Sequence, residues 1–261
     1  MLSIRYSLIT LMLLSCSACH AAEEDVRTLN YFVAQKQSRP FQIEQGDDQH
    51  RGVVTDLLQE IATRLGLDIR FHVLPYKRYR QEMISGSTSH WITYGAPNWA
   101  PPQSGRLGKE SIMTVSHSAL SLASEPAPPL QRAEDLCHYN VVLMDGFYYV
   151  ELDELLNNGC ITDYRVRSHR AACLFVDRND PPALFVEMTY RIRYTLMEEQ
   201  WPAQHFRLTD ISAIIPPYDI FFSYSADIPD ALIRAIDAEI HAMKASGELQ
   251  RILATYQHPS G

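Results

Sequence analysis

The stretch Val53-Val54-Thr55-Asp56-Leu57-Leu58-Gln59-Glu60-Ile61-Ala62-Thr63-Arg64-Leu65 is the clearest helix pattern in the chain. Its apolar residues recur every three or four positions, so they share one face of a helix. Gly66 follows at once, where a glycine commonly ends a helix. Residues 69–74 then alternate and are rich in β formers, which predicts a strand.

The neighbouring segments extend this pattern in both directions. Residues 29–33 form a short apolar run typical of a buried strand, 77–85 predict a short helix that ends at Gly86, and 90–94 predict another strand. Strands that alternate with helices indicate a parallel sheet covered by helices.

A second series of elements follows the stiff, Pro-rich segment 125–129. We expect strands at 141–144, 161–166 and 172–176, helices at 147–156 and 181–199, a connecting strand at 218–224, and helices again after Pro229. The chain therefore predicts two α/β units.

Composition restricts the function. The 261 residues are 46% apolar and 21% charged, as in a globular protein, and the net charge is −8. No Lys/Arg-rich run exists, which argues against nucleic acid as a partner. No paired His/Cys spacing, nucleophile elbow, phosphate-binding loop or dinucleotide-binding loop occurs, so we expect no metal, no cofactor and no enzymatic activity.

The first 22 residues have the pattern of a secretory signal peptide. One positive charge at Arg5 precedes a short apolar run and a region of small residues that ends at Ala21 and Ala22. Cleavage after either alanine predicts a soluble periplasmic protein. The alternative is a lipid anchor at Cys16, because the residues before it resemble a lipobox.

Three cysteines remain after that segment: Cys137, Cys160 and Cys173. An exported protein can form a disulfide. Cys137 and Cys160 both precede strand-like runs, so we expect them to pair with each other. The alternative is three buried thiols.

Several short motifs carry a resemblance to a known family, the extracytoplasmic solute-binding proteins of family 3, which are polar-amino-acid receptors of ABC importers. The resemblance covers residues 29–256. The motifs are Ser38-Arg39-Pro40-Phe41 with Arg51-Gly52-Val53-Val54-Thr55-Asp56-Leu57-Leu58, Leu74-Pro75-Tyr76-Lys77-Arg78 with Ile84-Ser85-Gly86, residues 106–118, Ala133-Glu134-Asp135-Leu136, and residues 228–256.

The resemblance implies an α/β, periplasmic-binding-protein-like type II fold with a ligand cleft between two lobes. Lobe 1 would comprise residues 23–122 and 223–261, and lobe 2 residues 123–222. A monomer that closes around its ligand by hinge motion is expected.

Three charged residues are candidates for ligand contacts. The resemblance implies that Arg106 binds a ligand carboxylate and that Asp177, after the expected strand 172–176, binds an ammonium group. Arg78 is a further candidate. The alternatives are a solvated loop arginine at Arg106 and a capping or turn aspartate at Asp177.

Aromatic residues form the second group of candidates. Gly146 is expected to open a helix whose first N–H groups can hold an anion, but Phe147 and Tyr148 follow it where the family usually has small polar residues. This departure suggests a more aromatic cleft. Further rings lie at expected strand ends or in loops, where they line a cleft or simply pack in the core: Tyr31, Phe41, Tyr76, Tyr94 and Trp99.

Together these features predict a periplasmic binding protein that captures a small polar or aromatic, amino-acid-like molecule, with an ABC permease as partner. One alternative is a sensory binding module with a separate membrane partner. Another is an enzyme similar to cyclohexadienyl dehydratases, in which an acid or base would come from Lys77, Lys109, Glu110 or Asp177.

Overall fold

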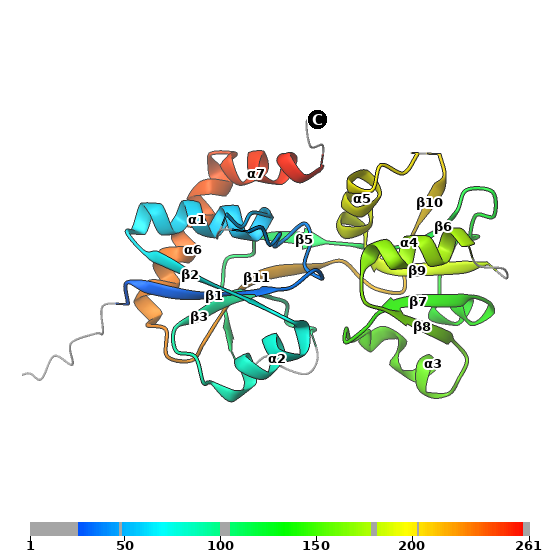
Figure 1. The fold of residues 1–261 in the computed structure, drawn as a ribbon, viewed down its shortest axis with the longest axis horizontal. Helices are drawn as coiled ribbons and strands as arrows, with labels where there is room; N and C mark the ends of the chain where they lie inside the picture. Colours follow the sequence, from blue (N-terminus) through cyan, green and yellow to red (C-terminus); the bar gives the residue numbers. More distant parts are fainter. Residues whose placement is uncertain (1–25, 47–48, 100–104, 179–181, 203, 258–261) are drawn as a thin grey trace, which may run out of the picture.

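A computed structural model describes residues 26–46, 49–99, 105–178, 182–202 and 204–257. The expected signal peptide, the lipid-anchor cysteine Cys16 and residues 100–104 lie outside these ranges. Two α/β lobes lie side by side, each built around its own sheet (Figure 1).

The first lobe contains a mixed sheet in the order β2-β1-β3-β11-β4, with β5 also paired to β11. β1 is parallel to β2 and β3, whereas β11 is antiparallel to β3, β4 and β5. Its strands are β1 (Thr28–Ala34), β2 (Asp68–Leu74), β3 (Trp91–Gly95), β4 (Arg106–Leu107), β5 (Met113–Val115) and β11 (Tyr218–Tyr224).

Four helices belong to this lobe: α1 (Val53–Leu65), α2 (Tyr76–Ser85), α6 (Asp230–Ala245) and α7 (Glu248–Gln257). The helix predicted at 53–65 is confirmed residue for residue. Its apolar stripe is buried, and Gly66 ends it with φ 66°, a left-handed conformation that suits glycine.

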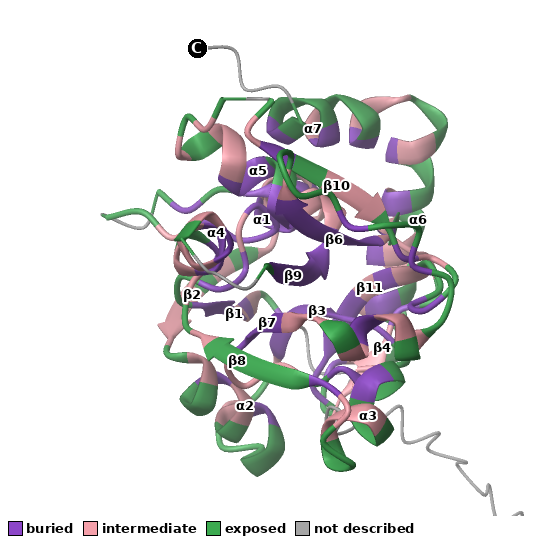
Figure 2. Ribbon diagram, turned by 90° about the vertical axis from the view of Figure 1, so that its right-hand side faces the viewer, coloured by how far each residue is buried: buried purple, intermediate pink, exposed green. Residues whose placement is uncertain are grey.

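The second lobe contains the sheet order β10-β6-β9-β7-β8. Figure 2 shows β6 and β9 as buried inner strands and β8 as an exposed edge. Its elements are β6 (His117–Leu122), β7 (Asn140–Met144), β8 (Thr162–Val166), β9 (Ala183–Met188), β10 (Phe206–Asp210), α3 (Asp153–Asn157), α4 (His169–Arg178), α5 (Thr189–Glu198) and the 3-10 turns η1 (Ala133–His138) and η2 (Val150–Leu152).

Three predicted elements of this lobe are wrong. The strand expected at 172–176 lies inside helix α4. The helix expected at 181–199 is strand β9 followed by helix α5. The helix expected at 147–156 begins only at Val150, with η2 and then α3, so Gly146 lies in a turn and opens no helix.

The chain crosses between the sheets in two places. β6 was assigned to lobe 1 by the expected boundary at residue 122, but it pairs with β9 and β10 of the second sheet. The expected boundary at residue 222 cuts β11, which belongs entirely to the first sheet. The crossings therefore lie between Val115 and His117, and just before Tyr218.

A disulfide joins Cys137 and Cys160, whose Cα atoms are 5.0 Å apart. Cys173 is a buried free thiol, and burial raises its pKa to about 12. Among the described residues, no helix is long and apolar enough to cross a membrane.

Candidate functional site

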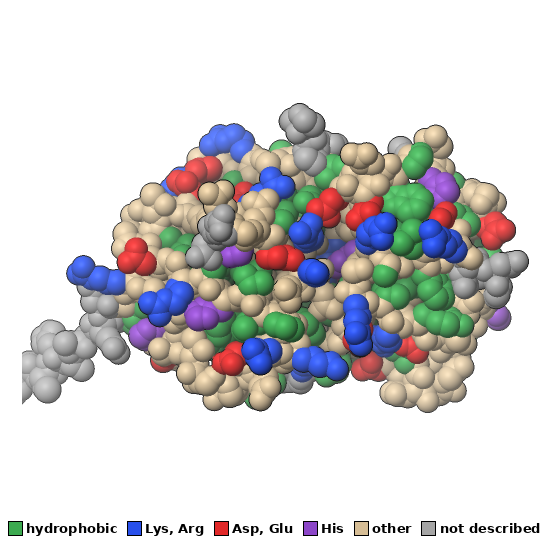
Figure 3. Space-filling model, viewed as in Figure 1, with side chains coloured by type: hydrophobic (Ala, Val, Ile, Leu, Met, Phe, Trp, Pro, Cys, Tyr) green, Lys and Arg blue, Asp and Glu red, His purple; other side chains and the backbone are tan. Residues whose placement is uncertain are grey.

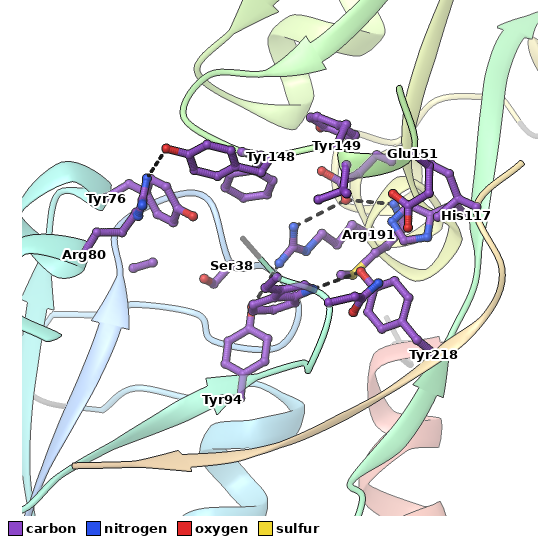
Figure 4. A pocket seen from close by; sticks show the side chains of 18 of the residues that line it. Ser38, Tyr76, Arg80, Tyr94, His117, Tyr148, Tyr149, Glu151, Arg191 and Tyr218 are labelled. Carbon is purple, nitrogen blue, oxygen red and sulfur yellow. Dashed lines mark hydrogen bonds and ion pairs between the residues drawn. The ribbon is translucent and has the colours of Figure 1, made fainter. Parts of the chain in front are cut away.

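A cavity of about 100 Å³ lies where the two lobes meet. Side chains from both lobes line it, and many of them are aromatic (Figure 4). The aromatic lining residues are Tyr76, Tyr79, Tyr94, Trp99, Phe147, Tyr148, Tyr149 and Tyr218. A cavity with mostly aromatic walls and a few polar groups is typical of a site for a small organic molecule.

Arg191 is the central cation of this cavity. It lies in the first turn of α5 and is only 2% exposed. Its guanidinium donates to Tyr94 Oη at 3.0 Å across the lobe boundary. The guanidinium carbon lies 5.3 Å from the Phe41 ring centre and 5.1 Å from that of Phe147, so two rings flank the charge.

Glu187, near the end of β9, is the counter-charge. Its Oε1 accepts from Arg191 Nη1 at 3.4 Å and from the Met188 backbone N–H at 2.8 Å, and its Oε2 lies 3.3 Å from His169 Nε2. Burial acts to raise the pKa of Glu187, but Arg191 and His169 outweigh it and lower the pKa to about 2. Burial likewise opposes the charge of Arg191, yet Tyr94 and Glu187 raise its pKa. Both members of the pair are therefore ionised at neutral pH.

His117 begins β6 and faces the cavity beside Tyr218, with the ring centres 5.6 Å apart. It is 5% exposed, and burial lowers its pKa to about 4. The ring is therefore neutral at neutral pH. Its Nδ1 has no hydrogen-bond partner in the described part of the chain, and the same holds for Nε of Arg191.

The stability of the protein should depend on pH through His117. The ordinary pKa of 6.5 falls to about 4 on folding, so the unfolded state binds more protons below pH 6.5. The stabilisation is complete above pH 6.5 and is lost as the pH falls toward 4. We expect His117 to lower the free energy of unfolding by about 2 kcal/mol between pH 7 and 5. Denaturant unfolding at both pH values measures this.

The matched variant is His117→Gln, which keeps a polar side chain but cannot titrate. Glu187 adds little to this slope, because both its folded pKa of about 2 and its ordinary pKa of 4.5 lie below pH 5. The variant should therefore show a flatter profile. Equal slopes for the variant and the unchanged protein would refute this assignment.

The aromatic wall is fixed by hydrogen bonds between rings of different elements. Trp99 Nε1 donates to Tyr218 Oη at 3.0 Å, and the Trp99 ring meets Tyr94 edge-on with centres 5.5 Å apart. Burial raises the pKa of Tyr218 to about 12, so its hydroxyl stays protonated. These rings form an apolar wall with polar edges.

The mouth of the cavity lies between α2 and the turn after β7. Arg80 donates to Tyr148 Oη at 3.0 Å and covers that ring at 4.8 Å, joining the two lobes. Gly146 has φ +83°, and a Cβ there would lie 3.0 Å from Tyr76 Cδ1. Glycine therefore permits both the turn and the close approach to Tyr76.

Six of the residues expected from the sequence come together here. Tyr76, Tyr94, Trp99, Phe147 and Tyr148 line the cavity, and Gly146 lines the groove outside it. The aromatic departure after Gly146 thus faces the space between the lobes.

The charged residues expected from the sequence do not line the cavity, and this corrects their assignment. Arg106 binds Asp230 and the carbonyl of Ile228 on the first lobe. Arg78 is exposed on α2. Asp177, which follows no strand because 172–176 is helical, lies in α4 with its Oδ1 2.7 Å from His205 Nε2.

Two aromatic expectations are also corrected. Tyr31 is a core residue of β1 whose hydroxyl lies 3.1 Å from Thr55 Oγ1. Phe41 is fully buried behind Arg191 and packs against Tyr94 and Tyr190. Both support the site from the core of the first lobe.

Sequence reasoning missed Glu187, Arg191 and His117. A signal for one of them existed, because Glu187 is the one charged residue in the apolar run 183–188. A charge in a buried strand needs a partner. If 181–199 were one helix, Glu187 and Arg191 would be four residues apart on it and would form an ordinary helical ion pair.

Searches with protein-family models and among curated proteins find no match. Solved structures do resemble this one. An amino acid ABC transporter substrate-binding protein, AbpA from Streptococcus pneumoniae bound to L-arginine, is 13% identical over 88% of this chain and 94% of that protein, with a TM-score of 0.67.

Two further structures are similar. The GluR0 ligand-binding core in complex with L-glutamate is 13% identical over 88% of this chain and 97% of that one, with a TM-score of 0.67. The ancestral amino-acid-binding protein AncCDT-1, a precursor of cyclohexadienyl dehydratase, is 14% identical over 89% and 96%, with a TM-score of 0.64. The expected fold, type II periplasmic-binding-protein-like, is therefore confirmed.

Proposed function

We propose that this protein is a periplasmic solute-binding protein that closes its two lobes around a small organic molecule. The observation that carries the proposal is the aromatic cavity between the lobes, at which Arg191 Nε and His117 Nδ1 are buried without a partner in the described chain. Unpaired buried polar groups are costly, and a ligand would satisfy them.

Contacts across the lobe boundary support a closing motion. Arg191 reaches Tyr94, Arg80 reaches Tyr148, and an ion pair joins Arg39 to Glu198. Their partners lie on opposite lobes, so each contact breaks when the lobes separate. A ligand that contacts both lobes shifts such an equilibrium toward the closed form.

The neighbouring structures favour an amino-acid-like solute, the cavity walls favour an aromatic one, and delivery to an ABC permease is the corresponding role. A sensory role is the second candidate for the same binding event. The similarity to the GluR0 ligand-binding core favours it. Ligand capture is common to both roles.

An enzymatic role has weaker support. Of the four groups that the sequence offered as acid or base, Lys77 lines only the outer groove, Lys109 and Glu110 lie near Asp237 and Lys244, and Asp177 lies on α4. The one favourable observation is the similarity to AncCDT-1. Turnover of any bound compound would revive this alternative.

A thermal-shift screen of the mature protein tests the proposal. A ligand that binds only the folded state raises the melting temperature, by an amount that grows with concentration. The panel contains amino acids, aromatic acids, amines, polyamines and sugars. Trp99→Ala, which removes part of the cavity wall, should abolish the shift, whereas Arg106→Gln, outside the cavity, should leave it unchanged. A folded protein that responds to no compound would overturn the proposal.

A further inference from the structure

The charge pattern of the cavity restricts the ligand more than the fold does. Glu187 and Arg191 are both 2% exposed, and both charges are accounted for inside the protein. Oε1 of Glu187 accepts from Arg191 and from the Met188 N–H, and Oε2 lies beside His169 Nε2. Among the described lining residues, the other carboxylate is Glu151, which is exposed. A ligand ammonium would therefore find no buried carboxylate without a partner among these residues.

The buried polar atoms of the cavity that lack a partner favour an anion instead. Nε of Arg191 is a buried donor without a partner in the described chain, and a guanidinium has only donors. The neutral ring of His117 offers one donor and one acceptor. A ligand oxygen that accepts from Arg191 Nε and from His117 would satisfy both side chains.

The position of Arg191 at the start of α5 also favours an anionic ligand. It lies in the first turn of α5, a ten-residue helix without an acidic residue in that turn. The first backbone N–H groups of a helix lack intrahelical acceptors, and the helix dipole is positive at this end. A cation there is unfavourable for the helix itself, but it reinforces a site for an anion.

The charged side chains at the mouth of the cavity are also mostly positive. Arg80 lines both the cavity and the outer groove, and it has no carboxylate partner among the described residues. Lys77 and Arg165 line the groove beside it, although Arg165 pairs with Asp163, and Asp145 is the one carboxylate among the described residues that line the groove. Figure 3 shows Lys and Arg side chains gathering, with some carboxylates between them, along the middle of the face where the lobes meet. This arrangement attracts anions to the opening.

The walls define the rest of the ligand. Tyr76, Tyr94, Trp99, Phe147 and Tyr218 present ring faces or edges to the cavity. Flat aromatic bodies pack well against such walls. The cavity therefore combines an aromatic compartment with one anion-binding end.

We propose that the ligand is an aromatic carboxylic acid without an α-ammonium group, whose carboxylate is bound by Arg191 Nε and His117 and whose ring lies among the aromatic side chains. This inference rests on the proposed binding function. It moves the carboxylate contact from Arg106 on the first lobe to the start of α5 on the second. It also separates this chain from receptors whose cleft pairs an acid with the ammonium of an amino acid.

The test is a matched ligand series measured by isothermal titration calorimetry with the mature protein. The four compounds share a phenyl ring on a two-carbon chain that carries the polar group or groups: 3-phenylpropionate, 3-phenylpropanamide, L-phenylalanine and 2-phenylethylamine. Losing a hydrogen bond to a charged group costs about 10- to 100-fold in affinity. We expect the acid to bind at least about 10-fold more tightly than each of the others. Indole and hydroxyphenyl versions of the series cover larger rings.

Two variants separate the binding contact from a structural effect. Arg191→Lys keeps the charge opposite Glu187 but removes the Nε donor, and it should weaken acid binding about 10-fold or more. His117→Gln should weaken it less. Arg106→Gln is the matched control and should change nothing. Near-UV circular dichroism shows whether each variant keeps its tertiary packing.

The outcomes are distinct. Tighter binding of the amino acid or the amine, or an Arg191→Lys variant that folds and binds the acid equally well, overturns this inference while solute binding stands. Failure of every aromatic acid, with binding of another class in the wider screen, overturns it too. If no compound of any class binds, the proposed function itself fails. If Arg191→Lys does not fold, the ligand series and His117→Gln still decide.

Discussion

Replacing Glu187 with leucine is expected to lower the free energy of unfolding by about 3–5 kcal/mol. The substitution leaves the guanidinium of Arg191, 2% exposed, without its carboxylate, and it leaves His169 Nε2 without its partner. An uncompensated buried charge is among the most destabilising changes a protein can carry. Urea unfolding at pH 7 measures the loss.

The double variant Glu187→Leu with Arg191→Met serves as the critical control. Removing both charges leaves apolar side chains of similar shape, which is often nearly neutral for a buried pair. The double variant should therefore recover most of the stability lost by Glu187→Leu. Glu60→Leu is the surface comparison, because its i,i+4 pair with Arg64 is 2.9 Å long but largely solvated, and it should cost less than about 1 kcal/mol. A loss at Glu187 no larger than that at Glu60 would show that Arg191 is not buried as described.

Removing the Cys137–Cys160 disulfide is expected to cost roughly 3 kcal/mol. The cysteines are 23 residues apart, and the bridge ties the 3-10 turn η1 to the residues just before β8, an edge strand of the second sheet. Cross-linking a loop of this length restricts the unfolded chain. The double variant Cys137→Ser with Cys160→Ser should unfold at a lower denaturant concentration than the oxidised protein.

Reductant provides the comparison for this variant. Dithiothreitol should lower the stability of the unchanged protein toward that of the double variant and should leave the variant itself unaffected. Cys173 remains a buried thiol in both, so it does not contribute to the difference. An unchanged protein that is equally stable with and without reductant would show that the bridge does not form.

The sequence predicted the first lobe better than the second, for a physical reason. The helix at 53–65 has a long amphipathic stripe and a glycine stop, so periodicity alone defines both ends. In contrast, 172–176 is a five-residue apolar run, which is too short to separate a buried strand from a helix. The buried residues His169, Ala172, Cys173 and Val176 lie three and four apart, and this spacing only makes sense once the whole segment 169–178 is considered.

Only the aromatic part of the site was predictable from the sequence. The aromatic residues after strand ends could be placed, because carboxyl ends of strands line clefts in α/β folds. The charged residues could not be placed, because strand and helix were exchanged over 172–199. The acidic residue near the end of a strand is therefore Glu187 on β9 and not Asp177 on α4. The register of β6 against β9 puts His117 opposite Met188, next to the ion pair of Glu187 and Arg191. No spacing within the sequence encodes that neighbour.

The place of β11 in the first sheet determines the order in which the molecule can be completed during synthesis. All strands of the second sheet come from one continuous segment, 117–210, whereas the first sheet needs Tyr218–Tyr224 between β3 and β4. Once β10 has left the ribosome, every strand of the second lobe is available, but the first lobe still lacks β11. Until β11 emerges, β3 keeps an open edge of unpaired amides. The first half of the chain to be made is therefore the last to be finished, and it depends longest on protection from aggregation.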